Sequence, residues 1–346
     1  MKTSVSIVFF ILCLLNFVSA QEISKKGNTD FTIAFGSCNK QNSPQPFWEE
    51  ILKNEPDVFI WGGDNIYGDS DDMSKIADDY KIQNSNLEYQ KLKSSIPIMA
   101  TWDDHDYGKN DVGVEWYKKK ESQQLFLDFI DVAKDDERRK REGIYTSHFF
   151  ETSKGSVKVM ILDTRYFRDS LRKDTTGKKR YMPHKNLKRT ILGKKQWIWL
   201  EKELKSSRAD FNVLISSIQF LSGEHGWESW ANFPNEVLKL EELISKTEAK
   251  NCLILSGDRH ISEFSKKNIS TIPYPLIDFT SSGLTHAYTK YGGEPNQYRT
   301  GKVIAIPSFG VLKFDFDRKL VTMQMRGINN VLLQEIKQEY LKKQNN

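Results

Sequence analysis

The sequence is poor in cysteine, carries little net charge, and has no internal repeat or low-complexity tract. After residue 20 it also lacks an apolar run of the roughly 20 residues needed to cross a bilayer, so no transmembrane segment is predicted. No long linker divides the remainder. We therefore expect a single domain over residues 21–346.

The first twenty residues differ from the rest of the chain. Lys2 supplies a positive start, residues 7–15 form an apolar run too short to span a membrane, and Val18-Ser19-Ala20 provides small residues before Gln21. This pattern predicts a cleaved signal peptide at residues 1–20, with an uncleaved anchor as the alternative. The protein is thus expected to be secreted or periplasmic.

The net charge of +5 is too mild to indicate nucleic-acid binding. The basic residues are unevenly spread, however, because residues 165–195 contain twelve Lys or Arg and only two Asp. Two interpretations remain open for this segment: a solvated loop, or a field that draws anionic substrates inward.

Cys38 and Cys252 are the two cysteines beyond the first segment, and an even pair in an exported protein suggests a disulfide. We do not expect one here. Cys38 ends one strand-like run and Cys252 begins another, which predicts that they lie at opposite ends of parallel neighbours. Cys252 stands in an apolar stretch typical of core packing, so Cys38 needs another role.

Strand and helix patterns alternate along the chain. Strands are expected at residues 31–35, 57–61, 96–100, 212–216 and 252–256, with antiparallel pairs at 144–152 and 157–163 and at 309–315 and 320–326. Helices are expected at residues 46–53, 73–92, 115–133, 194–206 and 235–249. This order predicts an α/β sandwich of mixed sheets, with ligands bound beyond the carboxyl ends of the parallel strands.

Four short segments at those strand ends share one design, in which small residues follow an apolar strand and precede metal-ligating side chains. They are Gly36-Ser37-Cys38-Asn39, Gly63-Asp64-Asn65-Ile66-Tyr67-Gly68-Asp69, Thr101-Trp102-Asp103-Asp104-His105-Asp106 and Ser256-Gly257-Asp258-Arg259-His260. Carboxylates gathered in one volume repel each other unless cations neutralise them. The segments therefore predict a metal site.

The ligand types narrow the choice of cation. Asp and His suit Zn, Mn or Fe, and additional carboxylates suit Ca or Mg. A Cys thiolate together with a Tyr phenolate favours a strongly Lewis-acidic ion such as ferric iron.

In these motifs the chain resembles the alkaline phosphatase D family, a branch of the calcineurin-like metallophosphoesterase superfamily. The resemblance extends from Phe31 to about Phe316 and includes Leu162-Asp-Thr-Arg-Tyr-Phe-Arg168 and Arg189-Thr-Ile-Leu-Gly-Lys-Lys-Gln196. It implies a metallophosphoesterase-type α/β/β/α sandwich, in which two mixed sheets are flanked by helices.

The resemblance also implies the ligands of two cations. Asp64 would bridge them, Cys38, Tyr67 and His260 would surround an iron-like ion, and Asp104 and Asp258 would face calcium. Mn or Zn remain possible. The place of the superfamily's lone histidine falls near residues 216–219, which contain no histidine, so the second cation's surroundings stay open, including a contribution from Asn110.

Three further residues are candidates for catalysis. His105 is the expected proton donor or phosphate ligand, and its neighbour Asp106 is expected to orient the imidazole. Arg165 is expected to bind phosphate in a bidentate manner, with Arg259 as a second candidate. The alternative for either arginine is a pair with a nearby Asp.

Other histidines are weaker candidates. His148 falls in the predicted hairpin and His184 in the basic segment, whereas His225 is placed at the mouth of the site. His286 follows a strand end, where it would support the ligands.

The leading functional hypothesis is a secreted metal-dependent hydrolase of phosphomonoesters or phosphodiesters, acting on small-molecule or lipid substrates. An alternative is a metal-stabilised binding protein of the same fold that has lost catalysis. A nucleic-acid-binding protein would need interleaved aromatics and a stronger charge, so no nucleic-acid partner is expected. The sequence leaves the oligomeric state open.

Overall fold

The structure is a computed structural model that describes residues 29–340. The predicted signal peptide at residues 1–20 lies outside the described residues. Within residues 29–340, no helix is both long enough and apolar enough to cross a membrane.

One mixed sheet has six strands in the order β13-β12-β11-β1-β2-β3. These strands are β1 (Phe31–Gly36), β2 (Val58–Gly62), β3 (Ile98–Thr101), β11 (Phe309–Asp315), β12 (Leu320–Arg326) and β13 (Leu332–Glu339). The first three are mutually parallel, and β11 pairs with β1 in the antiparallel sense. The carboxyl ends of β1, β2 and β3 therefore meet at one edge of the sheet.

The second mixed sheet has the order β10-β8-β9-β7-β6-β5-β4. Its strands are β4 (Thr146–Glu151), β5 (Ser156–Ile161), β6 (Phe211–Ile215), β7 (Cys252–Ser256), β8 (Ser262–Lys267), β9 (Leu276–Ser281) and β10 (Arg299–Ile304). Strands β5, β6, β7 and β9 are parallel to one another, and β4, β8 and β10 complete the sheet with antiparallel pairings.

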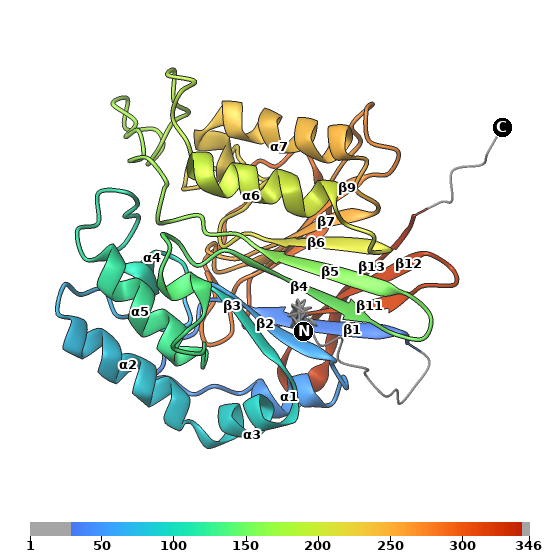
Figure 1. Cartoon of the computed structure of the whole chain (residues 1–346), viewed down its shortest axis with the longest axis horizontal. Helices are drawn as coiled ribbons and strands as arrows, with labels where there is room; N and C mark the ends of the chain where they lie inside the picture. Colours follow the sequence, from blue (N-terminus) through green and yellow to red (C-terminus); the bar gives the residue numbers. More distant parts are fainter. Residues whose placement is uncertain (1–28, 341–346) are drawn as a thin grey trace, which may run out of the picture.

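Helices cover the outer faces of both sheets (Figure 1). Beside the first sheet lie α1 (Trp48–Leu52), α2 (Met73–Ser85), α3 (Leu87–Ser95), α4 (Asp104–Tyr107) and α5 (Lys119–Phe129). Across the second sheet lie α6 (Gly193–Lys205) and α7 (Pro234–Thr247). Short 3-10 turns occur at Glu137–Arg139, Trp230–Asn232 and Ile328–Asn330. The result is a four-layered α/β/β/α sandwich.

The alternation of side chains along the strands explains the four layers. In β2, Val58 and Ile60 join the apolar core that contains both sheets, whereas Phe59 and Trp61 join a second core with helices α1, α2, α3 and α5. Successive residues of a strand point to opposite faces, so a strand buried on both sides reads as an unbroken apolar run. This confirms the predicted class, with two mixed sheets flanked by helices.

The helix expected at residues 73–92 is two helices, since the chain breaks at Asn86. The Asn86 backbone is extended, and its side-chain oxygen accepts a hydrogen bond from the backbone N–H of Tyr89 at 2.9 Å. An Asn that caps a new helix in this way ends the preceding one. Strands β8, β9, β10 and β13 were not predicted, because their apolar residues are interrupted by polar ones.

Cys38 and Cys252 are both free and buried. The expectation of no disulfide between them is confirmed, but the reason given from the sequence is wrong. Cys38 follows β1 and Cys252 begins β7, so the two cysteines belong to different sheets and not to neighbouring strands.

Candidate metal centre

The predicted ligands lie on the loops that follow β1, β2, β3 and β7. Four of them, Cys38, Asp64, Asp258 and His260, have φ between 50° and 68°. Non-glycine residues rarely adopt this left-handed conformation, and it is maintained only where surrounding contacts enforce it. Such strain, repeated on three loops, is typical of a functional site.

The first group of ligands surrounds the Cys38 thiol. One candidate ligand atom each from Cys38, Asp64 and His260 lies within 4.8 Å of the others. The Tyr67 hydroxyl is 3.2 Å from Asp64 Oδ2, to which it donates, and 2.9 Å from His260 Nε2. The structure therefore brings together all four residues that the resemblance placed around the iron-like ion.

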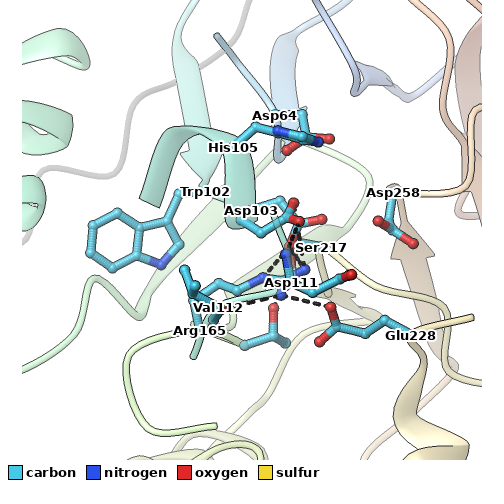
Figure 2. A network of polar contacts seen from close by, with 12 residues as sticks. Asp64, Trp102, Asp103, His105, Asp111, Val112, Arg165, Ser217, Glu228 and Asp258 are labelled. Carbon is cyan, nitrogen blue, oxygen red and sulfur yellow. Dashed lines mark hydrogen bonds and ion pairs between the residues drawn. The ribbon is translucent and has the colours of Figure 1, made fainter. Parts of the chain in front are cut away.

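Three aspartates form a second group. Ligand atoms of Asp103, Asp104 and Asp258 also lie within 4.8 Å of one another. Asp64 is near both groups, because its carboxylate forms a further close set with Asp104 and His105. This arrangement fits the bridging position expected for Asp64, and Figure 2 shows Asp64, Asp103 and Asp258 around one volume.

Three carboxylate oxygens in this volume have no hydrogen-bond partner among the described residues, although they are buried: Asp64 Oδ1, Asp103 Oδ2 and Asp104 Oδ1. Burial, reinforced by neighbouring acidic groups, raises the pKa values of Asp64 and Asp258 well above the usual range. Buried polar atoms normally have partners. The donor set is therefore one that fits cations, which would satisfy these oxygens.

The Cys38 thiol fits the same conclusion. Burial raises its pKa to about 11, so the protein alone does not stabilise a thiolate there. Its Sγ atom lies 3.0 Å from the Ser282 hydroxyl and 3.4 Å from Asp64 Oδ2. A cation is the partner that turns a buried thiol into a thiolate ligand.

His105 lies beside the ligands, with 18% of its side chain exposed. Its ring stacks obliquely on Tyr67 at 4.3 Å between centroids, and its Nδ1 lies 2.7 Å from Asp69. Burial lowers the pKa of His105, but the carboxylates of Asp64, Asp104 and Asp69 outweigh burial and raise the pKa to about 11. In the metal-free protein, these carboxylates therefore favour the protonated form of His105.

The expectation that Asp106 orients His105 is wrong. Asp106 is buried and accepts hydrogen bonds from the backbone N–H of Asp103 at 2.6 Å and from the backbone and side chain of Asn65 at 3.2 and 2.5 Å. It therefore ties the loop after β3 to the loop after β2. The residue that contacts the imidazole is Asp69. It belongs to one of the four predicted segments, but no role was assigned to it there.

Arg165 does not reach the site as a free phosphate ligand. Its side chain has no exposed surface, its Nε donates to Asp103 Oδ1 at 2.5 Å, and its Nη1 donates to Glu228 at 2.7 Å. Figure 2 shows the guanidinium between these two acids. The structure therefore shows the alternative interpretation, in which Arg165 pairs with acidic side chains. Arg259 behaves likewise, since it donates to both oxygens of Glu294 at 2.9 and 2.8 Å.

The sequence of this chain matches the family model of the PhoD-like phosphatases over residues 33–325. The chain belongs to the PhoD-like phosphatase family. It is 24% identical to alkaline phosphatase D of Bacillus subtilis (strain 168), over 73% of this chain and 52% of that protein. The chain thus spans about half the length of this curated relative.

Solved structures agree on the fold of this PhoD-like chain. A structure of PhoD superposes with a TM-score of 0.68 at 17% identity, covering 91% of this chain and 69% of the other. A dimetal phosphatase from Danio rerio superposes with a TM-score of 0.53 at 11% identity, covering 91% of this chain and all of that one.

Two residues of this PhoD-like site were missed by sequence reasoning. Asp103 belongs to the second ligand group, and its place beside Asp104 was the available signal. Ser282 contacts Cys38 and also accepts a hydrogen bond from the backbone N–H of His260 at 2.7 Å. Ser282 was assigned no role from the sequence, although it follows the strand end near which His286 was placed.

Two other uncertain positions are now placed. Ser217 occupies the region where the lone histidine was expected, and its hydroxyl donates to Asp103 Oδ1 at 2.6 Å. Asn110 is exposed, and it is the next residue, Asp111, whose backbone N–H donates to Asp104 Oδ2 at 2.6 Å.

Of the remaining histidines, His286 lies against the candidate ligands. Its ring centroid is 4.4 Å from that of His260 and 5.1 Å from that of Tyr67. His148 lies on β4 as expected, and His184 contacts the backbone carbonyl of Ser170. His225 contacts the carbonyl of Ser222 and accepts a hydrogen bond from the backbone N–H of Trp227.

Proposed function

We propose that this chain is a metal-dependent phosphoester hydrolase. The observation that carries the proposal is the group of three buried carboxylate oxygens that have no hydrogen-bond partner within residues 29–340 and lie near a buried thiol. Two cations held there would supply an activated water and would neutralise the charge of a phosphoryl group.

Cys38, Asp64, Tyr67 and His260 would hold a strongly Lewis-acidic ion, for which ferric iron is our proposal. Asp104 and Asp258 would hold the second cation, proposed to be calcium, together with Asp103. The free oxygens described above support the two cation positions, and the ligand types support the choice of ions. Manganese and zinc are the alternatives to be tested.

His105 is proposed to donate a proton to the departing alcohol. Its Nδ1 is occupied by Asp69, so Nε2 carries the proton that faces away from that carboxylate. Positioned acids of this kind contribute roughly 10²- to 10⁴-fold to a rate. The buried Arg165 holds Asp103 in place and contributes through it.

The proposed substrates are phosphomonoesters, phosphodiesters or both, on small molecules or lipids, and the site is proposed to work outside the cytoplasm. The relative from Bacillus subtilis bears the name alkaline phosphatase D, which supports the reaction class. Export rests on the signal-peptide pattern of residues 1–20.

The test is hydrolysis of p-nitrophenyl phosphate and of bis-p-nitrophenyl phosphate by protein stripped with chelator and reloaded with iron, calcium, manganese or zinc. We expect turnover that chelator abolishes and that Asp64→Ala removes. Asp78→Ala is the matched control, because Asp78 is an exposed acid on α2 paired with Lys81. Inertness under every metal condition would instead favour the metal-stabilised binding protein.

An absorption band in the visible range, from charge transfer between the Tyr67 phenolate and ferric iron, tests the metal assignment separately. We expect the band to disappear in Tyr67→Phe. Active protein without the band would contradict iron and leave the hydrolase proposal standing.

A further inference from the structure

Asp111 forms a hydrogen bond with one oxygen of the Asp104 carboxylate. The backbone N–H of Asp111 donates to Asp104 Oδ2 at 2.6 Å. The other oxygen, Oδ1, is buried and has no hydrogen-bond partner among the described residues, and its only ion-pair neighbour there is Arg165 at 3.8 Å. Asp104 is therefore oriented with one oxygen fixed and one available.

The backbone of Asp111 does not adopt this orientation freely. Its φ is 60°, a left-handed conformation that is uncommon for a non-glycine residue. Contacts that stabilise this state therefore help to keep the N–H pointed at Asp104.

Three side chains supply those contacts. Arg168 Nη2 donates to the Asp111 backbone carbonyl at 2.5 Å, and the Tyr181 hydroxyl donates to Asp111 Oδ2 at 2.7 Å. The Arg180 guanidinium forms an ion pair with the same carboxylate. Together they fix both the backbone and the side chain of Asp111.

All three contacts come from the basic segment at residues 165–195. Tyr181 is 7% exposed, and its backbone N–H donates to the carbonyl of Gly226 at 2.9 Å, so the tip of the segment packs onto the loop after β6. Arg168 is anchored at its other side by Glu228, at 2.9 Å. The segment is thus more than a solvated loop, because part of it turns inward to the ligand group.

We propose that Asp111 is a positioning residue for the second cation, and that Arg180 and Tyr181 of the basic segment hold it in its active conformation. The proposal rests on the proposed function only in requiring that a cation bind at Asp103, Asp104 and Asp258. Residues that orient metal ligands in this way typically contribute about 10- to 100-fold to metal affinity.

The test is calorimetric titration of Ca²⁺ and of Mn²⁺ into the stripped full-length protein, with a thermal unfolding curve for each variant. We expect Tyr181→Phe and Arg180→Gln each to weaken binding about 10-fold, with the unfolding temperature nearly unchanged for the half-exposed Arg180. Lys178→Gln is the matched control, since Lys178 is an exposed cation of the same segment. Its affinity should equal that of the wild type.

Substitutions of Asp111 separate anchoring from backbone strain. Asp111→Asn keeps an acceptor for Tyr181 and tolerates the left-handed conformation, so it should retain more affinity than Asp111→Gly. Glycine removes the strain but also both side-chain anchors. Wild-type affinity in Asp111→Gly, or in both Tyr181→Phe and Arg180→Gln, overturns the proposal.

The outcomes distinguish this inference from the proposed function. Wild-type protein that binds no cation and hydrolyses no ester contradicts both. Wild-type protein that binds and hydrolyses, while the variants bind equally well, contradicts the positioning role alone. If Tyr181→Phe does not fold, Arg180→Gln and Asp111→Asn decide the question.

Discussion

The Asp69 carboxylate lies 2.7 Å from Nδ1 of His105, although the two residues come from different loops. The loop after β2 carries Asp69, and the helix after β3 carries His105. Backbone N–H groups of Gly68 and Asp69 also donate to the carbonyl of His105, at 3.1 and 3.3 Å. The Asp69 side chain therefore holds the imidazole, and the loop after β2 also holds the backbone of His105.

Replacing Asp69 should impair His105 as a proton donor. The Asp69 carboxylate is one of the charges that raise the pKa of His105 to about 11, and cations bound at Asp64 and Asp104 would offset the other two. The donor is active below its pKa and is lost as pH rises through it. Asp69→Asn should therefore move the alkaline limb of the kcat profile to lower pH, with kcat at neutral pH reduced about 10-fold or more.

The measurement is the pH profile of kcat for hydrolysis of p-nitrophenyl phosphate, alongside His105→Asn. Asp71→Asn is a suitable control, because Asp71 is an exposed acid of the same loop that pairs with Lys109. An alkaline limb that stays in place in Asp69→Asn would show that this carboxylate does not set the protonation of His105.

The two cysteines provide a matched pair for the metal proposal. Burial raises the pKa of Cys38 to about 11 and that of Cys252 likewise to about 12, so both are thiols in the metal-free protein. A cation that binds the Cys38 sulfur must displace its proton, so its affinity should rise with pH. Cys38→Ser should weaken iron binding and shift its spectrum, whereas Cys252→Ser should not.

Calorimetry in buffers of different ionisation enthalpy counts the protons released when the cation binds. We expect about one proton fewer for Cys38→Ser than for wild type. Equal proton release by the two proteins would exclude the thiol as a ligand.

The strand ends were predictable because their signals are local. An apolar strand followed by a small residue and an acid or thiol needs no knowledge of the rest of the chain, and Cys38, Asp64 and Asp104 were found in this way. Parallel pairing of β1, β2 and β3 then places their carboxyl ends together. The same local signals defined the hairpin of β4 and β5.

The partners of those residues could not be predicted, because the contacts between them are not local in the sequence. Asp106 is adjacent to His105 in sequence, but on α4 it turns toward Asn65, and the contact with His105 comes from Asp69, 36 positions earlier. Contacts between loops depend on how both loops are folded. A sequence motif lists acids and bases and does not record which pairs meet.

The buried ion pairs predict a stability change. Glu228 pairs with Arg165 at 2.7 Å and with Arg168 at 2.9 Å, and none of the three side chains has more than 1% exposed surface. Removing one member of such a buried pair leaves an uncompensated charge, at a cost of about 3–5 kcal/mol. Glu228→Gln should lower the free energy of unfolding by about 3 kcal/mol, as measured by urea denaturation.

The surface pair of Asp78 and Lys81 is the control for this measurement. Their side chains are 67% and 78% exposed, so Asp78→Asn should change the free energy of unfolding by less than about 1 kcal/mol. Similar losses in the two variants would mean that burial does not set the strength of the Glu228 pairs.

His148 lies far in sequence from the metal ligands and predicts how stability depends on pH. It is half-buried on β4, and burial, with a smaller contribution from Arg138, lowers its pKa from 6.5 to about 4. A lowered histidine pKa means that folding disfavours the charged ring. The contribution of the neutral ring to the free energy of unfolding is fully present above pH 6.5 and is lost as pH falls through 6.5 toward 4.

Replacing His148 with glutamine removes this titration. Each pKa unit corresponds to about 1.4 kcal/mol, but solvent reaches part of the ring, so we expect a difference of only about 1 kcal/mol. Between pH 7 and pH 4, the free energy of unfolding should therefore fall by about 1 kcal/mol less in His148→Gln than in wild type. Urea denaturation of metal-free protein at both pH values measures this difference, and parallel losses in the two proteins would show that His148 does not cause the acid sensitivity.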